Sequence, residues 1–200
     1  MIYRTHQIIS MVKSAIGRNH LPQPLIGALD PDAVDLDSRI ACLIQQTARD
    51  VYAETPLALL VSEAKTFHSG GVYWHEPIGG IYSGHVLLPE DFMRLVAFEM
   101  SDWERPVFEA LNGESAQYAT TRSRFPGICG SIHRPVAAII NLPEGRALEF
   151  HSCKSEDAYI SQASYIATPT IDSHHGIDIA GNCIASVIAA LSSKIINHTP

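Results

Sequence analysis

Hydrophobic residues recur at helical spacing in three segments of the 200-residue chain, and these segments lie toward its two ends. In the first, apolar residues from Ile8 to Ile16 follow one another at steps of three and four, as one buried face of a helix requires. We expect this helix to end near Gly17, because Pro22 and Pro24 then impose an extended linker.

A second helix is predicted between an aspartate cap and a proline. Either Asp35 or Asp37 is placed to accept hydrogen bonds from the first free backbone N–H groups. The apolar stripe then runs from Leu36 to Val51, and Pro56 ends the segment.

The third predicted helix, from about Ile177 to Ile196, carries few charges on any side. Its larger apolar residues form one face, and its other face is small, with Ala180, Ala185 and Ala189. A helix of this kind is usually covered on more than one side. We therefore expect a partner subunit to cover the alanine face, and these three alanines are interface candidates.

The middle of the chain, from Leu57 to Tyr165, has the texture of strands and turns, because glycine and proline separate short apolar runs. Residues 135–142 and 146–152 predict two strands joined by a turn at 143–145. A further strand is predicted within 87–98, and 115–123 is either a short helix or a loop. Residues 68–84, with five glycines and a proline, predict a long exposed loop.

This order of elements predicts an α+β fold, in which N- and C-terminal helices form a helical bundle with an inserted β-rich lobe. Residues 1–56 and 170–200 would form the bundle. Residues 57–169 would form the lobe, including the glycine-rich loop at 68–84. Strands and helices do not alternate, and no phosphate-binding glycine motif is present, which disfavours a nucleotide-binding sheet.

Composition and charge narrow the classes of function. A net charge of −7 argues against broad binding of nucleic acid, because phosphate contacts need a surplus of lysine and arginine. It is compatible with a surface that lets DNA pass without sequence-specific binding. The N-terminal residues lack the features of a signal peptide, and the most apolar stretch is too polar to span a membrane. We therefore expect a soluble protein made in the cytoplasm, with its cysteines as free thiols.

The ten histidines and four cysteines raise the alternative of a small histidine- or cysteine-dependent metal or thiol enzyme. Metal ligands usually lie at short, regular spacing on one rigid element, and no such spacing occurs here. Cys129 precedes His133 by four residues, and Cys153 follows His151 by two, so that the second pair would share one face of a strand. Neither run has a catalytic signature. We expect no catalytic residue, no metal and no cofactor.

One segment in the middle carries residues typical of interface hot spots. Trp103 and Arg105 are close enough in sequence to form a cation–π pair or to anchor a partner. The alternative is that Trp103 fills the core of the β-rich lobe.

An ordered set of segments resembles a known family. Leu88-Pro-Glu-Asp-Phe92 is a leucine-proline-acid-acid-aromatic turn that leads into a strand. It is followed by a hairpin with the strand Ala147-Leu-Glu-Phe-His-Ser152, by Tyr165-Ile-Ala-Thr-Pro169 and by an alanine-rich C-terminal helix. From Asp35 to about Ile196 this order resembles the head–tail connector (adaptor or gatekeeper) proteins of tailed bacteriophages, including short-tailed and crAss-like phages.

The resemblance implies a viral structural protein in the virion, with no enzymatic activity. Copies would form a ring, expected to be dodecameric, under the portal protein, line the DNA channel and dock tail or nozzle proteins. Copies would meet through the helix face that carries Ala180, Ala185 and Ala189. The net negative charge of the chain suits such a channel, because a lining that repels phosphate keeps DNA from adhering.

Overall fold

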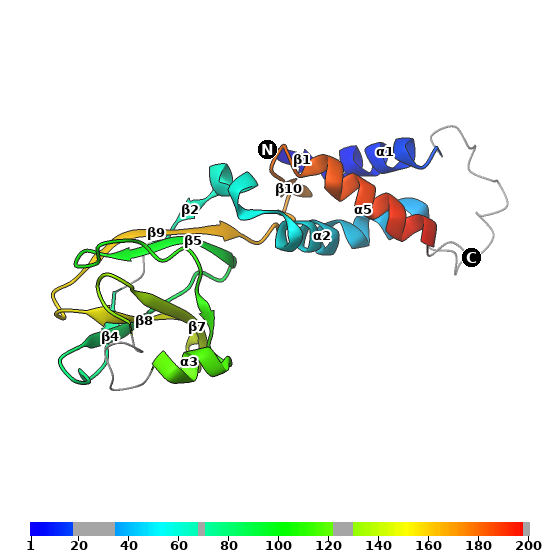
Figure 1. Ribbon diagram of the computed structural model, residues 1–200. Helices are drawn as coiled ribbons and strands as arrows, with labels where there is room; N and C mark the ends of the chain where they lie inside the picture. Colours follow the sequence, from blue (N-terminus) through cyan, green and yellow to red (C-terminus); the bar gives the residue numbers. More distant parts are fainter. Residues whose placement is uncertain (18–34, 68–70, 122–129, 198–200) are drawn as a thin grey trace. The chain divides into compact units, whose positions relative to one another are not determined.

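The computed structural model describes residues 1–17, 35–67, 71–121 and 130–197 (Figure 1). The chain divides into two compact units. The first combines Met1–Leu60 with Thr168–Pro200, and the second is Val61–Ala167. Each unit is described separately below.

The described residues of the first unit form three α-helices, one 3-10 helix and a two-stranded sheet. The three helices contact one another, and the two short strands pair antiparallel, with Tyr3 opposite Ile177. The elements are β1 (Ile2–Arg4), α1 (Thr5–Ala15), α2 (Leu36–Glu54), the 3-10 helix η2 (Leu57–Leu59), β10 (Gly176–Asp178) and α5 (Ile184–Asn197).

The predicted apolar stripes are the buried faces of these helices. Ile8 and Val12 of α1 are fully buried, as are Ile40 and Ile44 of α2 and Leu191 of α5. Burial of these apolar faces stabilises the three helices, because intrinsic helix propensity alone does not keep a short helix folded in water.

The start of α2 settles which aspartate is the cap. The Asp35 side chain accepts a hydrogen bond from the backbone N–H of Asp37 at 2.6 Å, and from the Ser38 hydroxyl at 2.9 Å. These bonds lower the pKa of Asp35, because they favour its charged form. Asp37 lies in the first turn and forms an ion pair with Lys13 of α1.

The third helix is shorter than its periodicity predicts, because α5 begins at Ile184 and not near Ile177. Residues 176–178 form β10 instead, paired with β1 at the other end of the chain. A turn closed by the Cys183 N–H on the Ala180 carbonyl then leads into the helix. Pairing across so long a separation leaves no periodic signal in either segment.

The described residues of the second unit form two sheets. One is three-stranded and antiparallel in the order β2-β9-β5, and the other is five-stranded in the order β3-β4-β8-β7-β6, with β6 parallel to β7. Its elements are the 3-10 helix η3 (Val61–Glu63), β2 (Lys65–Thr66), β3 (Tyr73–Trp74), β4 (Tyr82–Leu87), β5 (Phe92–Met100), β6 (Leu111–Asn112), α3 (Ala116–Thr121), β7 (Val136–Leu142), β8 (Gly145–Cys153) and β9 (Ile160–Ala167).

The predicted hairpin at 143–145 is present as β7–β8, with Leu142 opposite Gly145. Gly145 has a φ of +135°, a conformation that side chains with a Cβ rarely adopt. Pro143 and Glu144 form the connection between the strands. Turn chemistry therefore predicted the position of this hairpin, and its connection is one residue shorter than the predicted turn.

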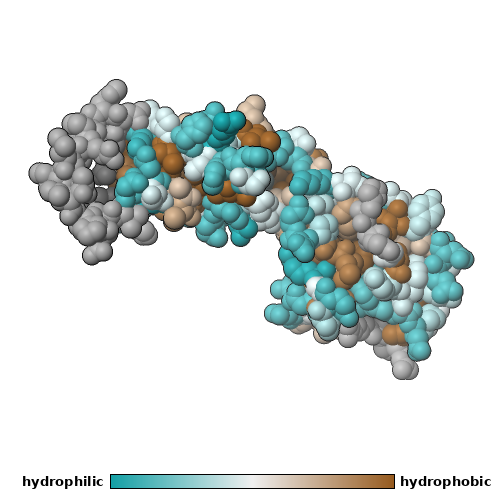
Figure 2. Space-filling view, turned by 180° about the vertical axis from the view of Figure 1, so that it is seen from behind, coloured by the Kyte–Doolittle hydropathy of each residue, from teal (hydrophilic) through white to brown (hydrophobic). Residues whose placement is uncertain are grey.

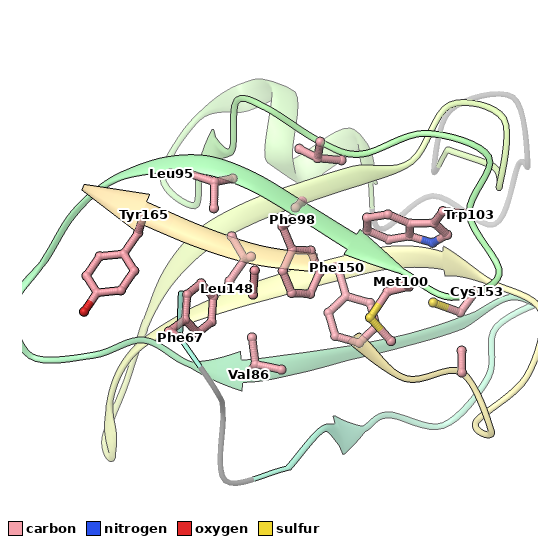
Figure 3. Close-up of a cluster of buried hydrophobic side chains, with 14 of the residues drawn as sticks. Phe67, Val86, Leu95, Phe98, Met100, Trp103, Leu148, Phe150, Cys153 and Tyr165 are labelled. Atoms are coloured by element: carbon pink, nitrogen blue, oxygen red, sulfur yellow. The ribbon is translucent and has the colours of Figure 1, made fainter. Parts of the chain in front are cut away.

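The core of the second unit lies between the inner faces of its two sheets (Figure 3). Phe98 of β5 and Phe150 of β8 are fully buried, with ring centroids 5.7 Å apart. Trp103 packs edge-on against both rings. Because side chains alternate along a strand, the residues between these core positions point to the opposite face of each sheet.

The predicted fold class, a helical bundle with an inserted β-rich lobe, is wrong. Strand and helix take nearly equal shares, 34% and 33% of the described residues, in three sheets and four α-helices. A sheet also belongs to the first unit, because residues 2–4 and 176–178 pair with each other. Helical periodicity located the helices but could not reveal strands built from short segments.

Strands also occur within residues 68–84, where an exposed loop was expected. Tyr73 and Trp74 form β3, and residues 82–84 begin β4. Residues 68–70 lie outside the described residues. The short helix considered for 115–123 is α3, over Ala116–Thr121.

Candidate functional site

The exposed side of α5 is the candidate assembly surface in the first unit. We call it the α5 outer face, and it consists of Ala185, Ser186, Ala189, Ser193, Ile196 and Asn197. Ile196 is 58% exposed. Figure 2 shows hydrophobic side chains, in brown, at the surface of this unit among hydrophilic ones.

No charged side chain belongs to the α5 outer face. The one charged residue of α5, Lys194, points to α2, where its ammonium lies 2.7 Å from the Asp50 carboxylate and 3.2 Å from the Thr47 hydroxyl. An exposed helix face usually carries charged residues, and here small, hydroxyl, amide and aliphatic side chains occupy it.

Ala180, the third of the alanines expected on this face, lies elsewhere. It precedes α5 and is 2% exposed. Its backbone N–H donates a hydrogen bond to the Tyr52 hydroxyl of α2 at 2.7 Å. Ala185 and Ala189 are therefore exposed, whereas Ala180 belongs to the core of the first unit.

Trp103 and Arg105 are placed very differently in the second unit. Trp103 is 6% exposed and packs among the aromatic rings of the core, whereas Arg105 is exposed. Of the two interpretations of Trp103, the one that places it in the core of the β-rich part is therefore correct.

Cys153 and His151 do not share one face of β8, contrary to the expectation from strand alternation. Ser152 between them has a φ of +91°, and the register with β4 shifts at this point. Cys153 consequently enters the core, where burial, reinforced by Asp102, raises the pKa of its thiol. A raised pKa disfavours the thiolate that a nucleophile needs. Cys129 lies outside the described residues.

A group of polar side chains that sequence analysis missed occupies the outer face of the five-stranded sheet. Glu149 of β8 is 3% exposed, and its carboxylate accepts a hydrogen bond from the Tyr118 hydroxyl of α3. The His75 Nδ1 lies 3.6 Å from Glu149 Oε1, and the His151 Nε2 lies 3.7 Å from Glu149 Oε2. Two imidazoles and a phenol thus surround one buried carboxylate.

The group extends to a third imidazole at the sheet edge. His75 Nε2 and His85 Nδ1 are 2.9 Å apart, within hydrogen-bond distance. Tyr73 stacks on His85 with ring centroids 5.1 Å apart. We call Tyr118, Glu149, His75, His85 and His151 the histidine–glutamate cluster.

Strand register brings this cluster together. His85 is directly opposite Glu149 across β4 and β8, and Tyr73 is directly opposite His85 across β3 and β4. Glu149 and His151 are two residues apart on β8 and therefore lie on one face. The alternation within 147–152 was the available signal, but assigning a partner to Glu149 required the register.

Each imidazole nitrogen of the cluster can donate or accept a hydrogen bond, depending on the tautomer. Among residues 1–17, 35–67, 71–121 and 130–197, no group of three or more histidine, cysteine, aspartate or glutamate side chains is arranged to hold a metal ion.

Within these same ranges, no helix combines the length and the apolar character that crossing a membrane requires.

Comparison of the chain with protein family models, with curated proteins and with solved structures finds no match.

Proposed function

We propose that this protein is a structural subunit of the head–tail connector of a tailed bacteriophage. Copies assemble into a ring beneath the portal protein, line the channel through which DNA leaves the capsid, and provide a platform for tail or nozzle proteins. The proposal rests on the ordered segments that resemble this family and on one structural observation, the α5 outer face.

The α5 outer face supports self-assembly because the free-energy cost of removing this face from water is small. Its alanine and serine side chains have little conformational entropy to lose and allow a second backbone to approach closely. It presents no charge that would need a partner, since Lys194 is engaged with Asp50 inside the unit. A surface that remained in water would gain solubility from charged residues here.

The net charge of −7 supports the proposed passage of DNA. An acidic lining repels the phosphate backbone, so that DNA slides through the channel without binding. Virion localisation, dodecameric stoichiometry and contact with the portal belong to this same proposal.

Ala185→Glu tests the proposed assembly surface. A carboxylate at this position would lie between copies, where it would lose its hydration without gaining a partner. We expect the variant to remain folded by circular dichroism but to form no ring by light scattering, either alone or with the portal protein encoded beside it. Wild-type protein should form the ring under one of these two conditions.

Ala53→Glu is the matched control. Ala53 is an exposed alanine of α2, so the same substitution adds the same charge to a helix outside the α5 outer face. We expect this variant to assemble like the wild type. A ring formed by Ala185→Glu, or equal loss of assembly in both variants, would contradict the proposed surface.

The neighbouring genes provide an independent test of the proposed function. A portal or capsid gene is expected beside this one. A wild-type chain that stays monomeric in the presence of that portal would contradict a connector.

The metal or thiol enzyme remains the alternative interpretation of the histidines and cysteines. No specific arrangement within the described residues favours it, since the Cys153 thiol lies in the core. A wild-type monomer that carries one zinc ion per chain by elemental analysis would favour the enzyme over the connector.

A further inference from the structure

β9 is paired along the whole of one edge and along only part of the other. On one edge, β5 runs beside β9 from Ile160 to Ala167. On the other edge, β2 has two residues and lies opposite Ser164 and Tyr165 alone. Among the described residues, no strand pairs with residues 160–162 on that second edge. β9 is therefore a central strand at one end and an edge strand at the other.

The last backbone hydrogen bond on the second edge lies just beyond β2. The Phe67 N–H donates to the Ala163 carbonyl at 3.1 Å. Because the N–H and the C=O of one residue in an antiparallel strand point to the same edge, the Ala163 N–H points to this edge as well. Backbone groups that line a strand edge are a template for pairing with a further strand.

A β-bulge marks the open end of β9. Glu99 is opposite Gln162 and Met100 is opposite Ile160, so Ser161 is an additional residue on β9. The Ser161 hydroxyl lies within hydrogen-bond distance of the Glu99 carbonyl, at 3.1 Å, and of Glu99 Oε2, at 3.2 Å. The Ser161 side chain therefore bonds to β5, and the bulge is held in place from that side.

A cavity of about 370 Å³ lies along the open end of β9. Its volume is within the range of about 300–1,000 Å³ that is typical of ligand sites. We call it the β9 groove, and it is lined by residues 66–67 and 160–164. Phe67 and Ala163 are 5% and 3% exposed, whereas Ser161 and Gln162 are exposed. The groove thus combines apolar, hydroxyl and amide groups, and none of these lining side chains is charged.

We propose that the β9 groove binds an extended, uncharged segment of another protein, which adds a strand beside residues 160–162. An extended polypeptide presents backbone N–H and C=O groups at the spacing of a strand edge, and these bonds supply the affinity in such complexes. Alternate side chains of the segment would enter the groove. A charged side chain would lose its hydration there without meeting an opposite charge on the lining.

The proposal is independent of ring formation through the α5 outer face. The lining residues all belong to the second unit, whereas the α5 outer face belongs to the first. Binding at the groove can therefore be measured whether the chain is a monomer or a ring.

An uncharged peptide that favours an extended backbone tests the groove. The probe is acetyl-Thr-Val-Thr-Val-Thr-amide, because β-branched residues favour the strand conformation. It is titrated into the isotope-labelled full chain while the backbone amide resonances are recorded by nuclear magnetic resonance. We expect saturable shifts of the amide resonances of Phe67 and residues 160–164, with little change elsewhere.

A methylated peptide and a pair of variants provide the controls. The same peptide with every backbone amide N-methylated keeps its side chains but loses its N–H donors, so it should leave these resonances unchanged. Gln162→Lys places a charge at the open edge, which disfavours strand pairing, and should weaken binding of the unmethylated peptide roughly tenfold. Gln117→Lys is the matched variant, because Gln117 is exposed on α3 outside the groove, and it should bind like the wild type.

Unchanged resonances at residues 160–164 on addition of the unmethylated peptide would overturn the proposal. So would equal shifts with the methylated peptide, or equal affinities of Gln162→Lys and Gln117→Lys. Shifts at residues 160–164 that follow dilution of the chain alone would assign the groove to a second copy and contradict a different protein as its occupant. If Gln162→Lys fails to fold, the two peptides decide with the wild-type chain.

Discussion

Buried polar residues on β8 distinguish this sheet from an ordinary half-exposed one. Glu149, His151 and Ser152 are 3%, 7% and 2% exposed, although all three are polar. A buried carboxylate is tolerated where hydrogen bonds and nearby cationic groups replace its hydration. The Tyr118 hydroxyl supplies one such bond to Glu149 from α3.

Tyr118→Phe should therefore destabilise the second unit. The change removes the hydroxyl and leaves the ring in place, so a buried carboxyl oxygen loses a hydrogen bond, at a cost of ~1–3 kcal/mol. The free energy of unfolding in urea, followed by tryptophan fluorescence, measures this cost. Tyr159→Phe, at a tyrosine that is 68% exposed, should change it little. Equal stability of the two variants would contradict the role of the Tyr118 hydroxyl.

At the scale of elements, α2 and α5 are joined by a polar contact beside their apolar faces. Asp50 accepts hydrogen bonds from Lys194 at 2.7 Å and from Gln46 at 2.7 Å. The bond from Lys194 is the largest cause that lowers the pKa of Asp50, followed by the bond from Gln46. The contact also keeps the only charge of α5 away from its outer face.

The lowered pKa of Asp50 predicts how this contact responds to acid. A carboxylate with a lower pKa in the folded state stabilises the fold above its unfolded value, here 3.8, and loses this contribution as the pH falls further. Asp50→Asn should be less stable than the wild type at pH 7, and the difference should vanish as the pH falls below about 3.8.

Thermal unfolding followed by circular dichroism at several pH values measures this difference. Glu54→Gln, at an exposed carboxylate of the same helix, should show no such loss at pH 7. A difference between Asp50→Asn and wild type that is constant across the pH range would contradict the ion-pair contribution.

At the scale of the whole molecule, the two units are built from the chain in different ways. The second unit is one continuous stretch, Val61–Ala167, with its own core between two sheets. The first unit must bring together the two ends of the chain, for β1 to pair with β10 and for α1 and α2 to pack on α5. Closing so long a loop costs conformational entropy, which the packing of the first unit must offset.

The continuous stretch should therefore fold without the rest of the chain. Both tryptophans, Trp74 and Trp103, lie within it, so tryptophan fluorescence reports on this unit alone. We expect a fragment of residues 61–167 to unfold cooperatively in urea, with a fluorescence midpoint close to that of the full chain. A fragment without a cooperative transition would show that the second unit depends on the first.

Particular residues show how far prediction from the sequence reached. The apolar stripes of α1 and α2 and the hairpin at Gly145 depend on neighbours within a few residues, and each was predicted. The cap of α2 was narrowed to Asp35 or Asp37, and α3 was one of two alternatives, a short helix or a loop. Of the three alanines expected on one exposed helix face, Ala185 and Ala189 are exposed and Ala180 is buried, and their role as an interface stays a prediction. The histidine–glutamate cluster was not, since His75, His85 and Glu149 are far apart in the sequence.

The sequence by itself determined the local elements, because hydrophobic spacing, capping and turn residues act within one or two turns of the chain. The tertiary structure alone decided what those elements face. It made residues 176–178 a strand through pairing with residues 2–4, and it turned Cys153 into the core through the conformation of Ser152. It also set His85 opposite Glu149. Register and long-range pairing depend on contacts between distant segments, and no pattern within one segment records them.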